Sequence, residues 1–222
     1  MTQTLWTAVD HYFADLLLPS DEALEFALAN SRAVGLPDIA VAPNQGKLLW
    51  MMAKLQGARR ILEIGTLGGY STIWLARAVP SHGHVVTLEI DPKHAEVARA
   101  NVAHAGLASV VDVRVGRASD QLASLEREGG APFDFTFIDA DKQSGAEYFA
   151  VALRMSRVGS AIVVDNVVRN GDVIDAKSTE ERVVGTRRLH EAIAKETRVT
   201  ATTLQTVGSK GHDGFTIALV VK

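Results

Sequence analysis

From residue 59 onward, short aliphatic runs alternate with longer segments in which apolar residues recur at helical spacing. The aliphatic runs read as buried strands, and they are RRILEI, HVVTLEI, VVDVRV, DFTFID and AIVVD. The segments between them read as helices, and they are GYSTIWLARAV, DPKHAEVARANVAHAG, ASDQLASLERE and GAEYFAVALRMS. This alternation predicts an α/β fold with a doubly wound, mostly parallel sheet that helices cover on both faces.

The ends of the chain follow other patterns. Three helices are predicted before the first strand, over about 3–17, 21–34 with Ser20 as N-cap, and 44–56 after Pro43. The last two apolar runs, VTATTLQTV and GFTIALVVK, flank GSKGHDG and predict a closing hairpin. We therefore expect one domain over 1–222, with a helical N-terminal extension (1–57) and an α/β core (58–222). The polar segment 169–185, before a helix TRRLHEAIAKE, is interpreted as either a lid or an ordinary surface loop.

The first strand runs into an acid and a glycine turn, EIGTLGGYS, which is typical of a ligand-binding strand-to-helix turn. A dinucleotide fingerprint starting at Gly65 would need glycine at two positions that hold Leu67 and Tyr70. A phosphate-binding loop fails as well, because Tyr70 and Ser71 stand where the motif counted from Gly65 requires glycine and lysine. The turn therefore does not match either phosphate-binding motif.

The acid of the turn, Glu63, would repel a pyrophosphate but would attract a ligand that carries a positive group. S-adenosylmethionine has an ammonium and a sulfonium, and its ribose hydroxyls suit a second acid. Glu89 ends the next strand 26 residues later, near the spacing at which such folds place a ribose-binding acid. The alternative for Glu89 is a surface acid before the Asp91-Pro92 turn.

A second group of polar residues follows the fourth and fifth strands in FDFTFIDADK and AIVVDN. Asp139, Asp165 and Asn166 offer only oxygen ligands, which favour Mg²⁺, Mn²⁺ or Ca²⁺ over Zn²⁺. Lys142, in the loop above Asp139, would be partly desolvated beside a metal ion and could serve as a general base. Each residue alone has an ordinary structural reading, as a helix cap, a turn or a solvated lysine. Their coincidence on two successive strand ends is what favours a site.

Composition limits the possible partners. A hydrophobic content of 47% in 222 residues suffices for a sizeable core, and the net charge of −3 with scattered cations does not favour nucleic acid or an anionic membrane. There is no cysteine, which fits a reducing compartment, and no apolar run is long enough to span a bilayer. The N-terminus lacks the pattern of a signal peptide, so cytoplasm is the expected location and a small molecule the expected substrate.

Together, VAPNQGKLL, LEIGTLGGYS, LEIDP, GRAS, FIDADK, VVDN and DGFTIALV resemble the cation-dependent class I O-methyltransferases of the catechol and caffeoyl-CoA type. The resemblance implies a seven-stranded sheet with an antiparallel last strand, and homodimers are common in this family. It implies that the metal is held by Asp139, Asp165 and Asn166 and that Lys142 is the catalytic base. The residues that it implies for S-adenosylmethionine are Val41, Glu63, Gly65, Thr66, Ser71, Glu89, Ala118 and Asp139.

The function expected from the resemblance is methyl transfer from S-adenosylmethionine to one hydroxyl of a catechol-like aromatic molecule that Mg²⁺ chelates. The substrate pocket departs from the family pattern. Relatives often have a tyrosine at the position of Gly145 and an asparagine near that of His190, and commonly have Glu-Gly-Gln where this chain has Gln45-Gly46-Lys47. His190 is interpreted as either a helix histidine or a substrate contact. Two alternatives stay open, namely an NAD-dependent oxidoreductase on a related fold and a non-catalytic cofactor-binding module.

Overall fold

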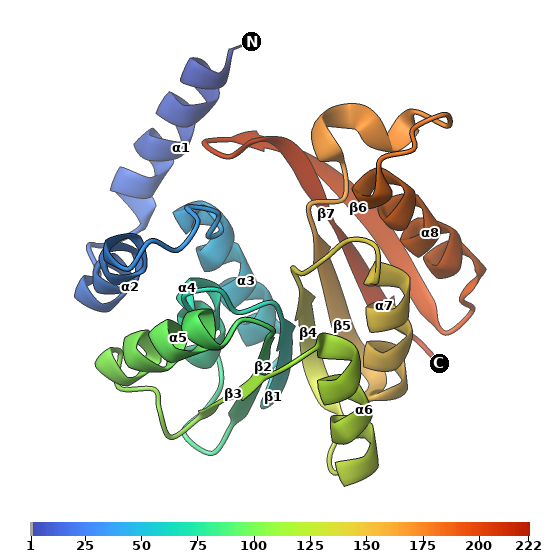
Figure 1. The fold of residues 1–222 in the computed structure, drawn as a ribbon, viewed down its shortest axis with the longest axis horizontal. Coiled ribbons are helices and arrows are strands. Elements are labelled where there is room, and N and C mark those ends of the chain that lie inside the picture. Colours follow the sequence, from blue (N-terminus) through green and yellow to red (C-terminus); the bar gives the residue numbers. More distant parts are fainter. Residues whose placement is uncertain (1) are drawn as a thin grey trace.

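The fold is a seven-stranded sheet between two layers of helices (Figure 1), in a computed structural model that describes residues 2–222. The strand order is β3-β2-β1-β4-β5-β7-β6, and β7 runs antiparallel to both of its neighbours while the pairs from β3 to β5 are parallel. The predicted doubly wound α/β fold is confirmed. The strands are β1 (Arg60–Ile64), β2 (His84–Glu89), β3 (Val111–Val115), β4 (Phe133–Ile138), β5 (Ser156–Asp165), β6 (Val199–Gly208) and β7 (Gly211–Val220).

Helices α3, α4 and α5 lie over one face of the sheet, and α6, α7 and α8 lie over the other (Figure 1). The alternation of side chains along β1 supplies both cores, since Ile61 packs with Phe135 and Ile73 while Leu62 packs with Leu122 on the opposite face. The helices are α1 (Gln3–Leu17), α2 (Glu22–Ala33), α3 (Pro43–Leu55), α4 (Tyr70–Ala76), α5 (Pro92–His104), α6 (Ala118–Glu128), α7 (Gly145–Arg154), the 3₁₀ helix η1 (Arg169–Ile174) and α8 (Glu181–Lys195).

Two predicted helix starts are wrong. The N-cap of α2 is Asp21, whose carboxylate accepts the amide of Leu24 at 3.1 Å, whereas the Ser20 hydroxyl donates to Glu25 instead. Asp is an equally good cap, so composition alone could not choose between two adjacent candidates. Helix α8 begins at Glu181, within the segment interpreted as a loop, because buried Val183 and Gly185 extend its packed face by more than a turn.

Helix α1 lies across the tip of the β6–β7 hairpin, whose antiparallel pairing confirms the predicted closing hairpin. The Gln3 amide donates to the carbonyl of Gly208 at 2.8 Å, and the Asp10 carboxylate accepts the amide of Ser209 at 2.7 Å. The N-terminal helix α1 and the tip of the C-terminal hairpin are thus joined on the same side of the sheet as the carboxyl ends of the parallel strands. Within residues 2–222, every helix is too short or too polar to cross a membrane.

Candidate active site

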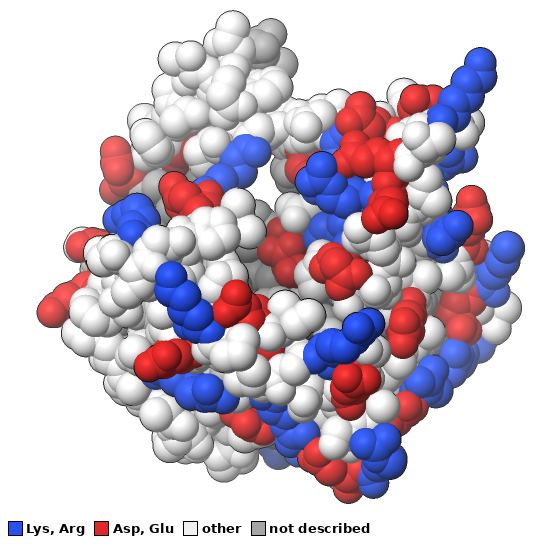
Figure 2. Space-filling model, viewed as in Figure 1, with Lys and Arg blue, Asp and Glu red and all other residues white. Residues whose placement is uncertain are grey.

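The carboxyl ends of four neighbouring parallel strands bring the predicted site residues to one edge of the sheet. Along this edge stand Glu89 at the end of β2, Gly65 after β1, Asp139 after β4 and Asp165 at the end of β5. Adjacent strands are about 4.8 Å apart, so the side chains of successive strand ends lie within reach of one another. Figure 2 shows a hollow on this side, between α2 and α5 on one flank and η1 with α8 on the other, with acidic side chains inside it.

Gly65 is required where the first and fourth strands separate. Its φ of +100° is disfavoured for residues with a side chain, and a Cβ at this position would lie 2.1 Å from the carbonyl oxygen of Asp139. The amide of Asp139 donates to the carbonyl of Ile64 at 2.8 Å, which holds the two backbones together. The glycine therefore brings the turn after β1 against the backbone of a predicted metal ligand.

Glu63 is completely buried, and its carboxylate accepts hydrogen bonds from three hydroxyl groups. The donors are Ser71 at 2.6 Å, Thr72 at 2.5 Å and Thr87 at 2.7 Å. Burial raises the pKa of Glu63 to about 7, although the three hydroxyls oppose the shift, and repulsion from Asp139 adds to it. The acid thus anchors the start of α4 to the sheet beneath the glycine turn.

Glu89 also supports the turn, through backbone amides. One carboxylate oxygen accepts the amides of Leu67 at 2.7 Å and Thr66 at 3.3 Å, and the other accepts that of Asp91 at 3.0 Å. Leu67 has a φ of +51°, so the position where a dinucleotide fingerprint would need glycine adopts the left-handed conformation without one. Glu89 is buried rather than the exposed surface acid considered as its alternative.

The other residues predicted to bind the cofactor come from the turn itself and from the starts of two helices. Val41 is buried just before Pro43 begins α3, Ala118 begins α6 after the end of β3, and the Thr66 hydroxyl lies 2.5 Å from that of Thr87. Asn101 holds the far side of the turn, because its amide donates to the carbonyl of Gly68 at 2.8 Å. No sequence motif distinguishes Asn101 from other helix asparagines.

Asp139 and Asp165, the two acids among the predicted metal ligands, form one charged cluster with the predicted base Lys142. Lys142 Nζ donates to Asp139 Oδ1 at 3.1 Å, and its side chain is 11% exposed. Burial raises the pKa of Asp165, and repulsion from Asp139 raises it further, while Lys142 opposes the shift. Asp139 and Asp165 are thus close enough to interact electrostatically across the ends of β4 and β5.

Gln45, at the start of α3, is a contact that the sequence did not indicate. Its side-chain amide donates to Asp165 Oδ2 at 2.6 Å, while Oδ1 accepts the amide of Asn166 at 2.8 Å. A residue of the N-terminal helices therefore touches a predicted metal ligand. The only sequence signal was that Gln45-Gly46-Lys47 departs from the pattern of the resembled family.

Asn166 adopts a φ of +55°, which asparagine tolerates better than most residues. The left-handed conformation turns the chain sharply after β5. A residue held in such a conformation at a strand end is frequent at binding sites, where the surrounding structure compensates for the strain.

His190 contacts other residues of the protein through both ring nitrogens. Nδ1 lies 2.8 Å from the carbonyl oxygen of Thr186, and Nε2 lies 2.8 Å from the hydroxyl of Thr216 on β7. The carbonyl accepts only, so Nδ1 carries a proton and donates it to Thr186. This geometry favours the interpretation of His190 as a helix histidine that joins α8 to the sheet.

The donor set at the strand ends fits a hard divalent cation. Asp139 and Asp165 supply carboxylate oxygens and Asn166 an amide oxygen, and such oxygen ligands suit Mg²⁺, Mn²⁺ or Ca²⁺. The two carboxylates repel each other, and a bound cation would relieve that repulsion. Over residues 2–222 no group of three His, Cys, Asp or Glu side chains is arranged as a metal site. The predicted donor set thus consists of two carboxylates, Asp139 and Asp165, and the Asn166 amide.

The sheet order, the glycine turn and the acids at the strand ends define a class I, Rossmann-like methyltransferase fold. The model of the O-methyltransferase family matches residues 21–220, and the chain belongs to this family. This membership favours the methyltransferase interpretation over the NAD-dependent oxidoreductase.

Individual relatives are similar over nearly the whole chain. A catechol O-methyltransferase of Niastella koreensis is 51% identical over 220 residues, which are 99% of this chain and 100% of the relative. The crystal structure of an O-methyltransferase from Bacillus cereus in complex with SAH has a TM-score of 0.97 at 56% identity, covering 99% of this chain and 100% of that one. The O-methyltransferase TomG from Streptomyces achromogenes, in complex with SAM, has a TM-score of 0.97 at 53% identity, with complete coverage of both chains.

Proposed function

We propose that the protein transfers the methyl group of S-adenosylmethionine to one hydroxyl of a catechol-like aromatic molecule, with the help of a divalent cation. The observation that carries this proposal is the adjacency of the glycine turn, with its buried acids, and the cluster of Asp139, Lys142 and Asp165 on neighbouring strand ends. The SAH and SAM complexes of similar structures support the cofactor, and the catechol O-methyltransferase relative supports the substrate class.

The cofactor would lie over the turn after β1. Its ammonium group is attracted to the acidic side of the turn, where Glu63 and Asp139 lie, and its ribose hydroxyls suit the carboxylate of Glu89. Val41 and Ala118 would contact it from the start of α3 and the start of α6, and Thr66 and Ser71 from the turn itself.

Asp139, Asp165 and Asn166 would hold the cation, and Mg²⁺ is the first choice because of the all-oxygen donors. A bound divalent cation favours the deprotonated form of a hydroxyl group that it coordinates. The two carboxylates would balance its charge, and the neutral amide, unlike a third carboxylate, would not repel an anionic substrate oxygen.

In the reaction, the bond between the substrate oxygen and the methyl carbon forms as the bond between that carbon and sulfur breaks. Lys142 Nζ, as the neutral amine, would accept the proton of the attacking hydroxyl, and S-adenosylhomocysteine would be the second product. Holding the two reactants in line accounts for most of the acceleration, because the displacement needs no covalent help from the protein.

The proposal is tested by methyl transfer from labelled S-adenosylmethionine to a catechol such as caffeate. Excess EDTA should abolish turnover and added Mg²⁺ should restore it, while Asp165→Ala should lose turnover but still bind S-adenosylhomocysteine. Glu196→Ala is a control, because that acid is paired with Arg198 away from the site. Turnover that is insensitive to the chelator would remove the metal from the proposal.

We also propose that the protein forms a homodimer through α1. None of the residues of this helix is buried, although six of its large apolar residues lie on one face at spacings of three, four and one. The neighbouring strand β6 likewise has no buried residue and continues the apolar surface with Leu204 and Val207. The six apolar residues of α1 are Leu5, Val9, Tyr12, Phe13, Leu16 and Leu17.

A second copy of the chain is the proposed occupant, because the exposed apolar residues of α1 lie on an element that Gln3 and Asp10 fix to the hairpin whose outer strand, β6, is the exposed edge of the sheet. Sedimentation velocity should give a dimer that Leu16→Glu dissociates. Ile174→Glu is the matched control, since Ile174 is also exposed but lies on η1. A monomeric wild-type protein would contradict the proposal.

A further inference from the structure

The segment after the predicted metal ligands is unusually strained. Asn166, Arg169 and Asn170 have φ between +55° and +57°, and Gly171 follows at +94°. Residues with side chains keep such conformations only where surrounding contacts fix them. Val167 and Val168 are buried and anchor the middle of the segment, but their side chains alone do not set the path of the backbone on either side of them.

Asp213, near the start of β7, supplies the missing contacts. One oxygen of its carboxylate, Oδ1, accepts the amides of Val168 at 2.9 Å, Arg169 at 3.1 Å and its neighbour Gly214 at 3.0 Å. The guanidinium of Arg169 lies 3.9 Å from the other oxygen. A half-buried carboxylate that accepts several backbone amides makes strong, charge-assisted hydrogen bonds.

Gly214 brings this carboxylate into place. Its carbonyl accepts the amide of Val167 at 3.0 Å, and a Cβ at residue 214 would lie 2.2 Å from the carbonyl of Leu204 and 2.8 Å from the Val168 side chain. The Asp213-Gly214 pair therefore binds three successive amides of the strained segment, at Val167, Val168 and Arg169. These amides follow directly after Asn166.

We propose that Asp213 is a positioning residue for the metal site. This proposal rests on the proposed function of that site. By fixing the backbone that follows Asn166, Asp213 holds the left-handed turn that directs the Asn166 amide toward Asp139 and Asp165. Asp213 does not itself touch the site residues. Groups that orient metal ligands in this way typically change metal affinity by about 10-fold to 100-fold when removed.

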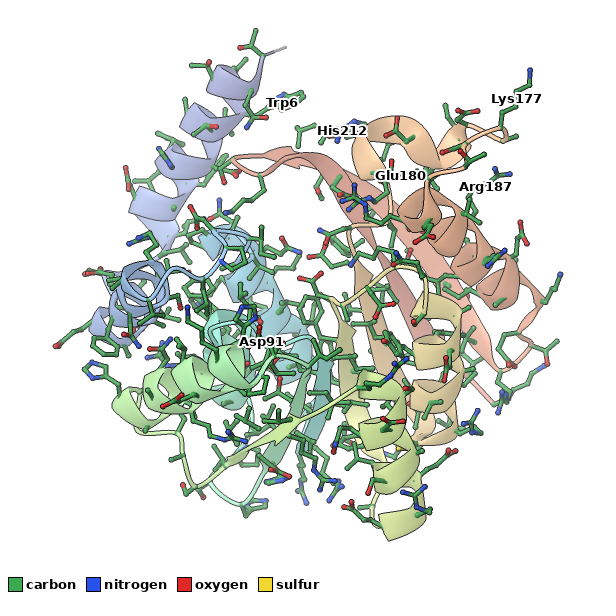
Figure 3. All side chains as sticks on the ribbon, in the orientation of Figure 1. Trp6, Asp91, Lys177, Glu180, Arg187 and His212 are labelled. Atoms are coloured by element: carbon green, nitrogen blue, oxygen red, sulfur yellow. The ribbon has the colours of Figure 1, made fainter. Side chains whose placement is uncertain are left out.

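The test is a calorimetric titration of Mg²⁺ into the full-length protein saturated with S-adenosylhomocysteine. Asp213→Ala should weaken Mg²⁺ binding by about 10-fold to 100-fold and leave S-adenosylhomocysteine affinity within about twofold. Asp213→Asn keeps an acceptor oxygen and should restore most of the Mg²⁺ affinity. The control is His212→Ala. His212, labelled in Figure 3, precedes Asp213 on β7, but its Nε2 lies 3.0 Å from Oε1 of Gln205 on β6.

Two further readouts separate positioning from a general structural role. Amide hydrogen exchange over 166–171 should accelerate in Asp213→Ala, while exchange in β1 should not change. Asp213→Ala combined with Asn166→Ala should weaken Mg²⁺ binding no more than Asn166→Ala alone, because Asp213 acts through Asn166. Should Asp213→Ala not fold, Asp213→Ser carries the same expectations, since serine is too short to reach the amides.

The inference is overturned if Asp213→Ala binds Mg²⁺ as wild type does, or if its affinities for Mg²⁺ and S-adenosylhomocysteine fall together. Failure of the proposed function gives a different result. The wild-type protein would then bind no Mg²⁺ at this edge, whereas the exchange experiment would still report whether Asp213 holds the segment.

Discussion

Replacing Glu63 with glutamine should change how the stability of the protein depends on pH. Glu63 is completely buried among the hydroxyls of Ser71, Thr72 and Thr87, and burial raises its pKa to about 7. The folded protein therefore binds a proton more tightly at this group than the unfolded chain does. Its contribution to stability is complete below the unfolded pKa and is lost as the pH rises through the folded pKa.

The size of the effect follows from the shift. A pKa raised from 4.5 to about 7 corresponds to about 3 kcal/mol in the free energy of unfolding, of which about 2.5 kcal/mol is lost between pH 5 and pH 8. Glutamine keeps the shape of the neutral acid and can bond with the same hydroxyls. Glu63→Gln should therefore gain stability relative to wild type as the pH rises.

Urea unfolding followed by circular dichroism at several pH values measures this difference directly. The two stability curves should diverge by about 2.5 kcal/mol between pH 5 and pH 8. Asp165, whose pKa burial also raises, is present in both proteins and largely cancels. Parallel curves would show that Glu63 ionises normally in the folded protein and would refute the reasoning from burial.

Three further substitutions test other parts of the site. Gly65→Ala should cost at least about 2 kcal/mol of stability and abolish cofactor binding, because alanine disfavours a φ of +100° and its Cβ would overlap the Asp139 carbonyl. Normal affinity for S-adenosylhomocysteine, measured by calorimetry, would contradict this prediction. Lys142→Ala should lower the rate by about 100-fold or more with Mg²⁺ and cofactor affinities retained, whereas a near-normal rate across pH would exclude Lys142 as the base. Asn166→Gly, which keeps the left-handed turn, should lose Mg²⁺ affinity as fully as Asn166→Ala; if only Asn166→Ala loses it, the backbone rather than the amide is what matters.

The sheet and the strand ends could be predicted because local patterns determine them. The aliphatic runs that end at Ile64 and Ile138 are the strands observed, and their alternation with helices requires the parallel arrangement that brings Gly65 and Asp139 together. The topology of the fold alone therefore predicted which acids gather at one edge. The predicted start of α8 was wrong because buried Val183 and Gly185 lie in a segment whose overall composition is as polar as that of a loop.

The contacts that helix side chains make with distant parts of the chain could not be predicted. Gln45 reaches Asp165 across 120 residues, and Asn101 reaches Gly68 from a different helix. Neither residue type nor spacing encodes such a contact, because the partner is set by how α3 and α5 pack on the sheet. The sequence indicated that Glu63 and Glu89 matter, but it did not reveal that both carboxylates support the turn through hydroxyls and amides.

The central claim is that oxygen atoms of Asp139, Asp165 and Asn166 share one divalent cation. The most direct measurement is anomalous diffraction from crystals grown with S-adenosylhomocysteine and Mn²⁺, which takes the oxygen ligands of Mg²⁺. The account predicts one strong peak at bonding distance, about 2.0 to 2.3 Å, from an oxygen of each of the three side chains. A peak elsewhere, or none at the edge formed by β4 and β5, would contradict it.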